Sequence, residues 1–186
     1  MRYLKLFESF EDITEICKKY GIKDYTINPD GSIDTKDVYL SYKELTKLPL
    51  KFNKVNGNFW CNNNYRLTLE GCPKEVNGGF YCYNNKLTSF EFVPKIIRGA
   101  FSCENNNIKS FEYFPSYAKN FWCDGNPIYE VWKLFENKDK IELLNDFDIF
   151  RDEDTDTPSI VMNRLNDFLL TIGGDPVEKV KGYKNI

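Results

Sequence analysis

Cysteine has the most regular spacing of any side chain in this sequence that could do chemistry. Cys61, Cys82, Cys103 and Cys123 follow one another at a nearly constant interval. Thiolates can bind zinc, but a structural zinc site needs four ligands at tetrahedral corners, usually from paired C-x-x-C spacings, which are absent here. We therefore expect no metal site and no cofactor, and we interpret these cysteines as small, buried apolar side chains.

The other residue types that could support catalysis do not form a recognisable site. The sequence contains no histidine, which removes the commonest general base and a common metal ligand. The acidic run from Asp152 to Asp156 begins like a calcium loop, but Thr157 and Asn163 stand where that loop needs Gly and Glu. No phosphate-binding loop or nucleophile-elbow motif is present. We therefore predict that the protein is not an enzyme.

The cysteines belong to a longer pattern that recurs with the same period, with phenylalanine two positions before each cysteine and asparagine three positions after it. Its members are Phe59, Phe80, Phe101 and Phe121, the four cysteines, and Asn64, Asn85, Asn106 and Asn126. A fixed period in the range of roughly 20–50 residues is the signature of a repeat protein in which successive turns of the chain stack.

The repeated pattern F-x-C-x-x-N-x-L resembles the leucine-rich repeat L-x-x-L-x-L-x-x-N-x-L, with Phe and Cys at the two strand leucines. The resemblance covers roughly residues 25 to 135. Phrases such as Leu45-Thr46-Lys47-Leu48-Pro49 and Asn84-Asn85-Lys86-Leu87-Thr88-Ser89 resemble, more narrowly, repeat proteins encoded by bacteriophages. The resemblance implies an α/β fold: a short solenoid with a parallel ladder of about five rungs, capped by helices at both ends.

The alternation of side chains in a short strand assigns a direction to each position of the pattern. Phe and Cys, two residues apart, should point together into the coil, while the residue between them points outward. The asparagine amide should satisfy main-chain groups at the turn. The outward positions and the polar or aromatic positions beside them are Tyr39, Trp60, Tyr81, Ser102 and Trp122, with Tyr83, Glu104 and Asp124.

The segments on either side of the array should cover its ends. We predict a helical cap over residues 1–24, a hairpin over 25–37 with its turn at Asn28-Pro29-Asp30-Gly31, the array over 38–128, and a helical cap over 129–173. Thr157 as N-cap and Pro158 at the first helical position predict the start of the last helix, and Gly173 its end. Residues 174–186 should form a frayed tail.

The outward aromatic residues have two interpretations. They can form a ladder that only stabilises the sheet, or they can supply rigid contact area for a partner. Leucine-rich repeats use this face for partners, so the resemblance favours the second interpretation. A formal charge of -3 and a pI of about 5.2 disfavour a nucleic-acid partner without excluding it, and no apolar run is long enough for a membrane span.

We therefore expect a phage-encoded, protein-binding module that docks on a host or viral protein through this face and could inhibit a bacterial defence or regulator. Because the first residues lack a secretory signal, we expect it in the cytoplasm of the bacterial host. One alternative is a structural or capsid-associated virion component, since Met1 to Glu11 resembles phage-head leader peptides. Another is a protein that sequesters a nucleotide or glycan on the same face or in a groove beside the C-terminal cap.

Overall fold

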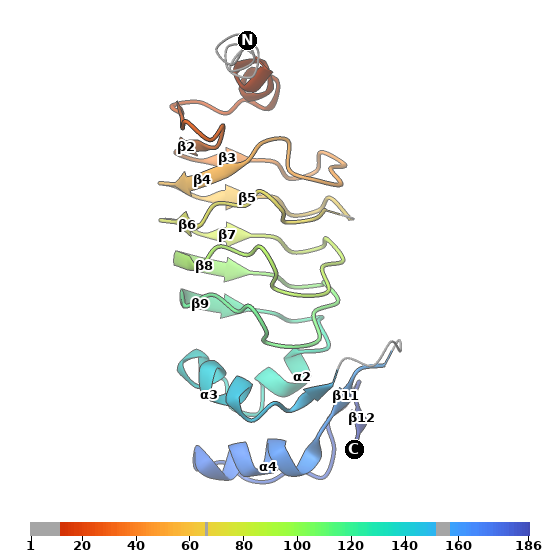
Figure 1. The fold of residues 1–186 in the computed structure, drawn as a ribbon. Helices are drawn as coiled ribbons and strands as arrows, with labels where there is room; N and C mark the ends of the chain where they lie inside the picture. Colours follow the sequence, from red (N-terminus) through yellow and green to blue (C-terminus); the bar gives the residue numbers. More distant parts are fainter. Residues whose placement is uncertain (1–11, 66, 152–156) are drawn as a thin grey trace.

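The computed structural model describes residues 12–65, 67–151 and 157–186 and shows a mixed α/β fold with a mostly parallel sheet. Successive turns of the chain stack in one column (Figure 1). The helical segment 12–20 lies at one end of this column, and the remaining helices lie at the other end.

Each turn of the chain contributes to two parallel strand ladders. The first ladder contains β3 (Val38–Tyr39), β5 (Phe59–Trp60), β7 (Phe80–Tyr81), β8 (Ile96–Ser102) and β9 (Tyr117–Trp122). The second contains β2 (Ile33–Thr35), β4 (Phe52–Val55) and β6 (Glu75–Val76), and continues into β8 and β9, which are long enough to join both ladders. In the first ladder Phe59 pairs with Phe80, Phe80 with Phe101, and Phe101 with Phe121, so equivalent positions of the sequence pattern are in register.

The inward positions of the first ladder form the centre of the core, as the pattern predicted. Phe59, Phe80 and Phe101 are completely buried, and their rings contact one another at centroid distances of 5.6 and 6.0 Å. Burying one such ring contributes about 1.5–3 kcal/mol. The four cysteines of the pattern are also buried and are free thiols.

The asparagines form a buried hydrogen-bond ladder that connects neighbouring turns. The Asn85 amide donates to the carbonyl oxygens of Cys61 and Cys82, both at 2.9 Å. The Asn106 side-chain oxygen accepts from the backbone N–H groups of Asn85 and Leu87, also at 2.9 Å. One side chain therefore satisfies backbone groups in its own turn and in the preceding turn, which confirms the predicted role of these residues.

A hairpin follows the helical segment 12–20, as predicted. β1 (Thr26–Ile27) pairs antiparallel with β2, and the turn is closed by hydrogen bonds from the Asn28 N–H to the Ser32 carbonyl and from the Gly31 N–H to the Asn28 carbonyl. Gly31 has a φ of +77°, which glycine adopts without steric cost. The first part of the predicted N-terminal helix and the leader-like segment Met1 to Glu11 lie outside the described residues.

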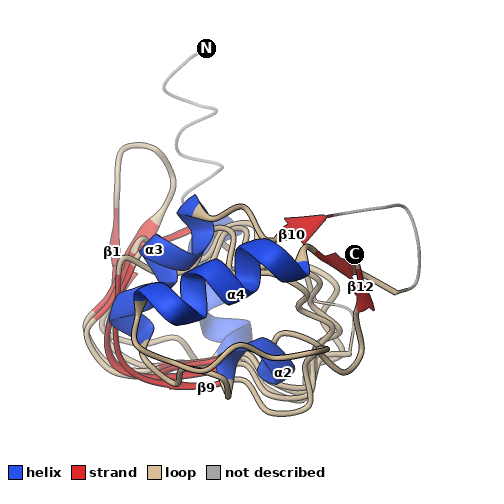
Figure 2. Cartoon of the chain, turned by 90° about the horizontal axis from the view of Figure 1, so that it is seen from below, coloured by secondary structure: helices blue, strands red, loops and turns tan. Residues whose placement is uncertain are grey.

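Within the described part of the chain, four short helices follow the last turn of the array: α2 (Tyr129–Trp132), the 3₁₀ helix η1 (Lys138–Lys140), α3 (Ile141–Asp146) and α4 (Met162–Thr171). Figure 2 shows α2, α3 and α4 lying across the end of the stacked turns. Their buried residues, among them Val131, Leu144 and Phe168, belong to the same core as the strands. No helix among the described residues has the length and apolar character needed to cross a membrane.

The C-terminal segment differs from the prediction in two places. The last helix begins at Met162 and not at Pro158, because β11 (Ser159–Ile160) is a strand that pairs with β10 (Phe150–Arg151) and with β12 (Lys184–Asn185). The predicted frayed tail is also wrong, since Val180 and Tyr183 are buried and the segment ends in β12. The acidic residues Asp152 to Asp156 lie outside the described part of the chain.

Candidate functional site

The outward side chains of the first ladder form an aromatic surface, which we call the strand face and define by Tyr39, Trp60, Tyr81, Ser102 and Trp122 with the neighbouring Tyr83, Glu104 and Asp124. The Tyr39 and Trp60 rings stack with centroids 4.5 Å apart and planes 10° from parallel. Trp60 and Tyr81 stack at 5.6 Å and 7°. The exposed fractions of Tyr39 and Trp122 are 58% and 44%.

Ser102 corrects the prediction for this face. It lies in register between Tyr81 and Trp122, as expected, but only 5% of it is exposed. Its short side chain lies between two large neighbours and donates a hydrogen bond to the Glu104 carboxylate. The aromatic column is therefore divided into a stacked group of three rings and a separate Trp122.

Gly79 explains why the Tyr81 ring can lie close to the sheet. A Cβ atom at residue 79 would lie 2.5 Å from the Tyr81 hydroxyl oxygen and 2.6 Å from two ring carbons. The missing side chain therefore makes room for the ring, which is half-buried. Tyr81 is held against the backbone, whereas Tyr39 at the other end of the stack projects into solvent.

The strand face is acidic. Its Glu104 and Asp124, and Asp37 next to it, lie in the ladder segments 37–41, 58–62, 79–83, 100–104 and 120–124, which contain no Lys or Arg. The Asp124 carboxylate raises the pKa of the neighbouring Tyr129 phenol, because ionisation would place a second negative charge beside it. The face thus combines aromatic rings with carboxylates, a combination that favours cationic groups.

The buried thiols are poorly placed for chemistry. Burial raises the pKa of Cys82 and Cys103 well above the usual range, so both stay protonated at neutral pH and are weak nucleophiles. Within residues 12–65, 67–151 and 157–186, no group of three or more His, Cys, Asp or Glu side chains is placed to hold a metal ion.

No family model matches this chain. No curated protein and no solved structure is significantly similar to it either. The chemistry of its own surfaces is therefore the basis for a functional assignment.

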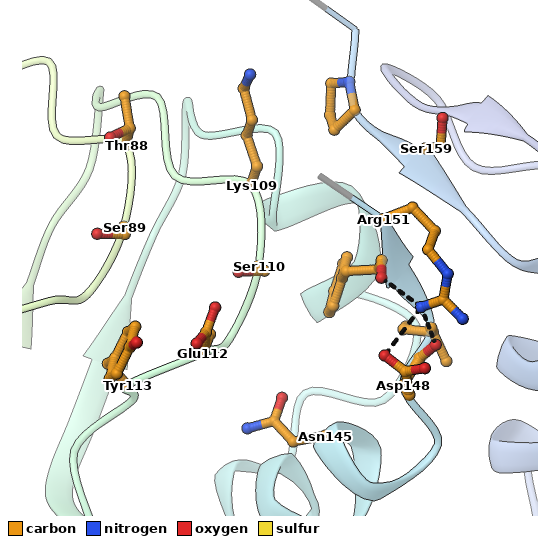
Figure 3. Close-up of a pocket in the computed structure, with 13 residues that line it drawn as sticks. Thr88, Ser89, Lys109, Ser110, Glu112, Tyr113, Asn145, Asp148, Arg151 and Ser159 are labelled. Carbon is orange, nitrogen blue, oxygen red and sulfur yellow. Dashed lines mark hydrogen bonds and ion pairs between the residues drawn. The ribbon is translucent and has the colours of Figure 1, made fainter. Parts of the chain in front are cut away.

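The structure has a second candidate binding surface, for which the sequence analysis named no residues. Two neighbouring clefts, of about 580 and 360 Å³, are both lined by Thr88 and Ser89, and we call the two together the side groove. It lies where each turn runs from the asparagine ladder toward the second strand ladder, and it ends against the C-terminal cap at Asp148 and Arg151. Figure 3 shows Lys109, Ser110, Glu112 and Tyr113 on one wall and Asp148 and Arg151 on the opposite wall.

Two exposed aromatic residues of the side groove have a left-handed backbone conformation, as do Tyr42 and Tyr65 outside it. Phe92 and Tyr113 have φ values of 65° and 62°, and they are 52% and 50% exposed. The equivalent residue of the preceding turn is Gly71, with a φ of 92°. The sequence carried a signal for this position, because Gly71, Phe92 and Tyr113 share the spacing of the cysteines, but the left-handed conformation of the two aromatic residues became visible only in the structure.

Proposed function

We propose that this protein is a non-enzymatic repeat module that binds a basic surface of another protein through the strand face. We also propose that its turns form a leucine-rich-repeat-like solenoid, on the basis of the sequence resemblance and the regular register of the two ladders. The observation that carries the binding proposal is the stack of the exposed Tyr39 on the half-buried Trp60 and Tyr81, beside acidic residues in segments without Lys or Arg.

The aromatic rings of the strand face are preorganised for binding. Stacking fixes the orientation of Trp60 between Tyr39 and Tyr81, so little conformational entropy is lost when a partner covers these side chains. Large rigid aromatic residues are the commonest energetic centres of protein interfaces. Lys or Arg of a partner could contact both the ring faces and the carboxylates of Glu104 and Asp124.

A purely stabilising ladder accounts for less of what is observed. Aromatic stacking contributes about 0.5–1.5 kcal/mol per pair beyond the burial of the rings. Trp122 is 44% exposed and is separated from the other rings by Ser102, so stacking along the ladder gives no reason for a tryptophan there. Contact with a partner would give a reason for an exposed tryptophan at this position.

The cellular setting belongs to the same proposal. The resemblance to phage-encoded repeat proteins supports a partner in the cytoplasm of a bacterial host, where the module would block a defence or regulatory protein by covering its basic surface. Inhibition by occlusion requires no catalytic group, in keeping with a chain that lacks histidine.

The test is capture of partners from bacterial lysate, followed by measurement of affinity with the purified partner. We expect the Trp60→Ala, Trp122→Ala double variant to bind at least about tenfold more weakly than wild type, because hot-spot aromatic residues contribute about 2 kcal/mol or more. Glu104→Gln with Asp124→Asn should weaken binding mainly at low salt. Tyr117→Ala is the matched control, since Tyr117 is equally exposed but pairs in the second ladder. Equal affinity for all variants would remove the strand face as the binding site.

A further inference from the structure

We propose that the side groove binds a linear, uncharged oligosaccharide, at a site separate from the strand face. The two surfaces share no residue. This inference is independent of the protein-binding proposal and rests on the strained aromatic residues, the repeated hydroxyl and carboxylate groups, and the balance of charge in the groove.

Phe92 and Tyr113 are difficult to explain by stability. In the left-handed region a side chain with a Cβ atom crowds its own backbone, whereas glycine does not. The preceding turn has Gly71 at the same place, so the turn itself needs no aromatic residue. About half of each side chain remains in solvent, so burial offsets less of the conformational cost than it would at a core position. Exposed strain of this kind is typical of binding sites.

The groove repeats its chemistry from turn to turn. Hydroxyl groups come from Thr68, Ser89 and Ser110, which are again one period apart. Glu91 precedes Phe92, and Glu112 precedes Tyr113, so each exposed aromatic residue follows an acidic one in the sequence. The Glu112 carboxylate is close enough to raise the pKa of the Tyr113 phenol. A linear saccharide is itself periodic, and each sugar offers hydroxyl donors to a carboxylate and an apolar C–H face to a ring.

The charges lining the groove are balanced. Among the lining residues, Lys86, Lys109 and Arg151 equal Glu91, Glu112 and Asp148 in number. Two further cations lie at the edge: Arg164 pairs with Asp148 at 2.7 Å, and the Lys95 ammonium lies 6.0 Å from the centre of the Tyr113 ring. Arg151 is already engaged, since its Nη1 atom lies 2.9 Å from Asp148 Oδ1 and 2.8 Å from the Asp148 carbonyl oxygen. A nucleotide phosphate would require uncompensated cations, and the Glu112 carboxylate opposes them on the groove wall. Balanced charge with many hydroxyl groups suits a neutral ligand.

The size of the groove also suits a chain of sugars. The larger cleft, about 580 Å³, falls in the range of roughly 300–1,000 Å³ that is usual for small-molecule sites. The smaller cleft continues it along the array through Thr88 and Ser89. A ligand that fills both clefts would contact Phe92 and Tyr113 at once, so affinity should rise with chain length until both rings are covered.

The proposal is tested by titration calorimetry with neutral glucose, mannose and N-acetylglucosamine oligomers of increasing length, and with galacturonate oligomers as the charged comparison. We expect one neutral series to bind, with affinity increasing from the monomer to longer chains. Phe92→Gly and Tyr113→Gly should each weaken binding roughly tenfold, because each removes one stacking ring. Both variants should melt at the same temperature as wild type or higher, since glycine relieves the strain.

The strand-face double variant Trp60→Ala, Trp122→Ala should bind the oligosaccharide as wild type does, which separates this proposal from the protein-binding one. Three outcomes would overturn the inference: no neutral oligomer binds, only the galacturonate oligomers bind, or the two glycine variants bind as tightly as wild type. A lower melting temperature of the glycine variants would also contradict it, because the rings would then be structural.

Discussion

At the scale of single residues, the asparagine ladder connects neighbouring turns by buried side-chain hydrogen bonds. The Asn106 side chain accepts two backbone N–H groups of the preceding turn and donates to the carbonyl oxygens of Cys82 and Cys103. All of these groups are buried in the core, so water cannot replace a lost partner. The value of the side chain therefore lies in its hydrogen bonds more than in its size.

Replacing Asn106 with leucine should be strongly destabilising. The substitution keeps the branching of the side chain, with bulkier methyl groups, but leaves buried N–H and C=O groups without partners, at a cost of about 3 kcal/mol or more in the free energy of unfolding. Asn107→Leu is the matched control, because Asn107 is exposed, and it should change stability by about 0.5 kcal/mol at most. Guanidinium denaturation of both variants measures the difference. Similar losses in the two would show that the ladder bonds contribute little.

The direction of the repeat side chains could be predicted from residue alternation alone. Phe80 and Cys82 are separated by two positions and point into the core, and Tyr81 between them points outward. Ser102 could not be placed in the same way, because its burial depends on the sizes of its neighbours across the ladder. The strained conformations of Phe92 and Tyr113 likewise depend on the shape of the turn, which residue type does not reveal.

At the scale of elements, the C-terminal segment acts as part of the cap. The Tyr183 side chain is buried, and its hydroxyl donates to the Lys109 carbonyl oxygen at 2.7 Å, although the two residues are far apart in the sequence. β12 pairs with β11 at the same end of the molecule. The sequence shows neither contact, because the strands are very short and their partners are distant. For the same reason Thr157-Pro158, a good helix start by local criteria, precedes a strand.

Tyr183 offers a graded test of this cap. Tyr183→Phe removes only the hydrogen bond to Lys109 and should lower the unfolding free energy by about 1 kcal/mol. Tyr183→Ala also removes the buried ring and should cost about 3–5 kcal/mol. Both are measured by chemical denaturation, with Tyr113→Phe, a change at an exposed ring, as the control. If Tyr183→Ala were as stable as wild type, the segment after Gly174 would not contribute to the folded core.

At the scale of the whole molecule, the two ladders pair each turn with its neighbours. Phe59 pairs with Phe80, and Phe80 pairs with Phe101, and no described strand of the array bridges distant turns. The period, readable from the spacing of Cys61, Cys82 and Cys103, therefore determines most of the architecture. What the period could not predict is the form of the two ends, where the repeat stops.

An array of this kind should tolerate the loss of one complete turn. Deleting residues 83–103 removes one full period and joins Cys82 to Glu104, which leaves every remaining pattern position in register. We expect a shorter protein that still unfolds cooperatively, with a native-like circular dichroism spectrum and reduced stability. Deleting residues 83–93 removes half a turn and should prevent folding. Loss of structure in both deletions would show that the turns are not interchangeable.

The asparagine ladder also has a direction, and this direction affects how the protein is made. Asn64 caps the amides of Lys43 and Leu45, Asn85 caps the amide of Asn64, and Asn106 caps that of Asn85, so each of these turns depends on the side chain of the turn that follows it. On the ribosome, a newly emerged turn must wait for its successor before its amides are satisfied. We therefore expect completion of the nascent array to lag translation by about one period, except at the last turn, where the Asn126 N–H bonds the Cys123 carbonyl of its own turn.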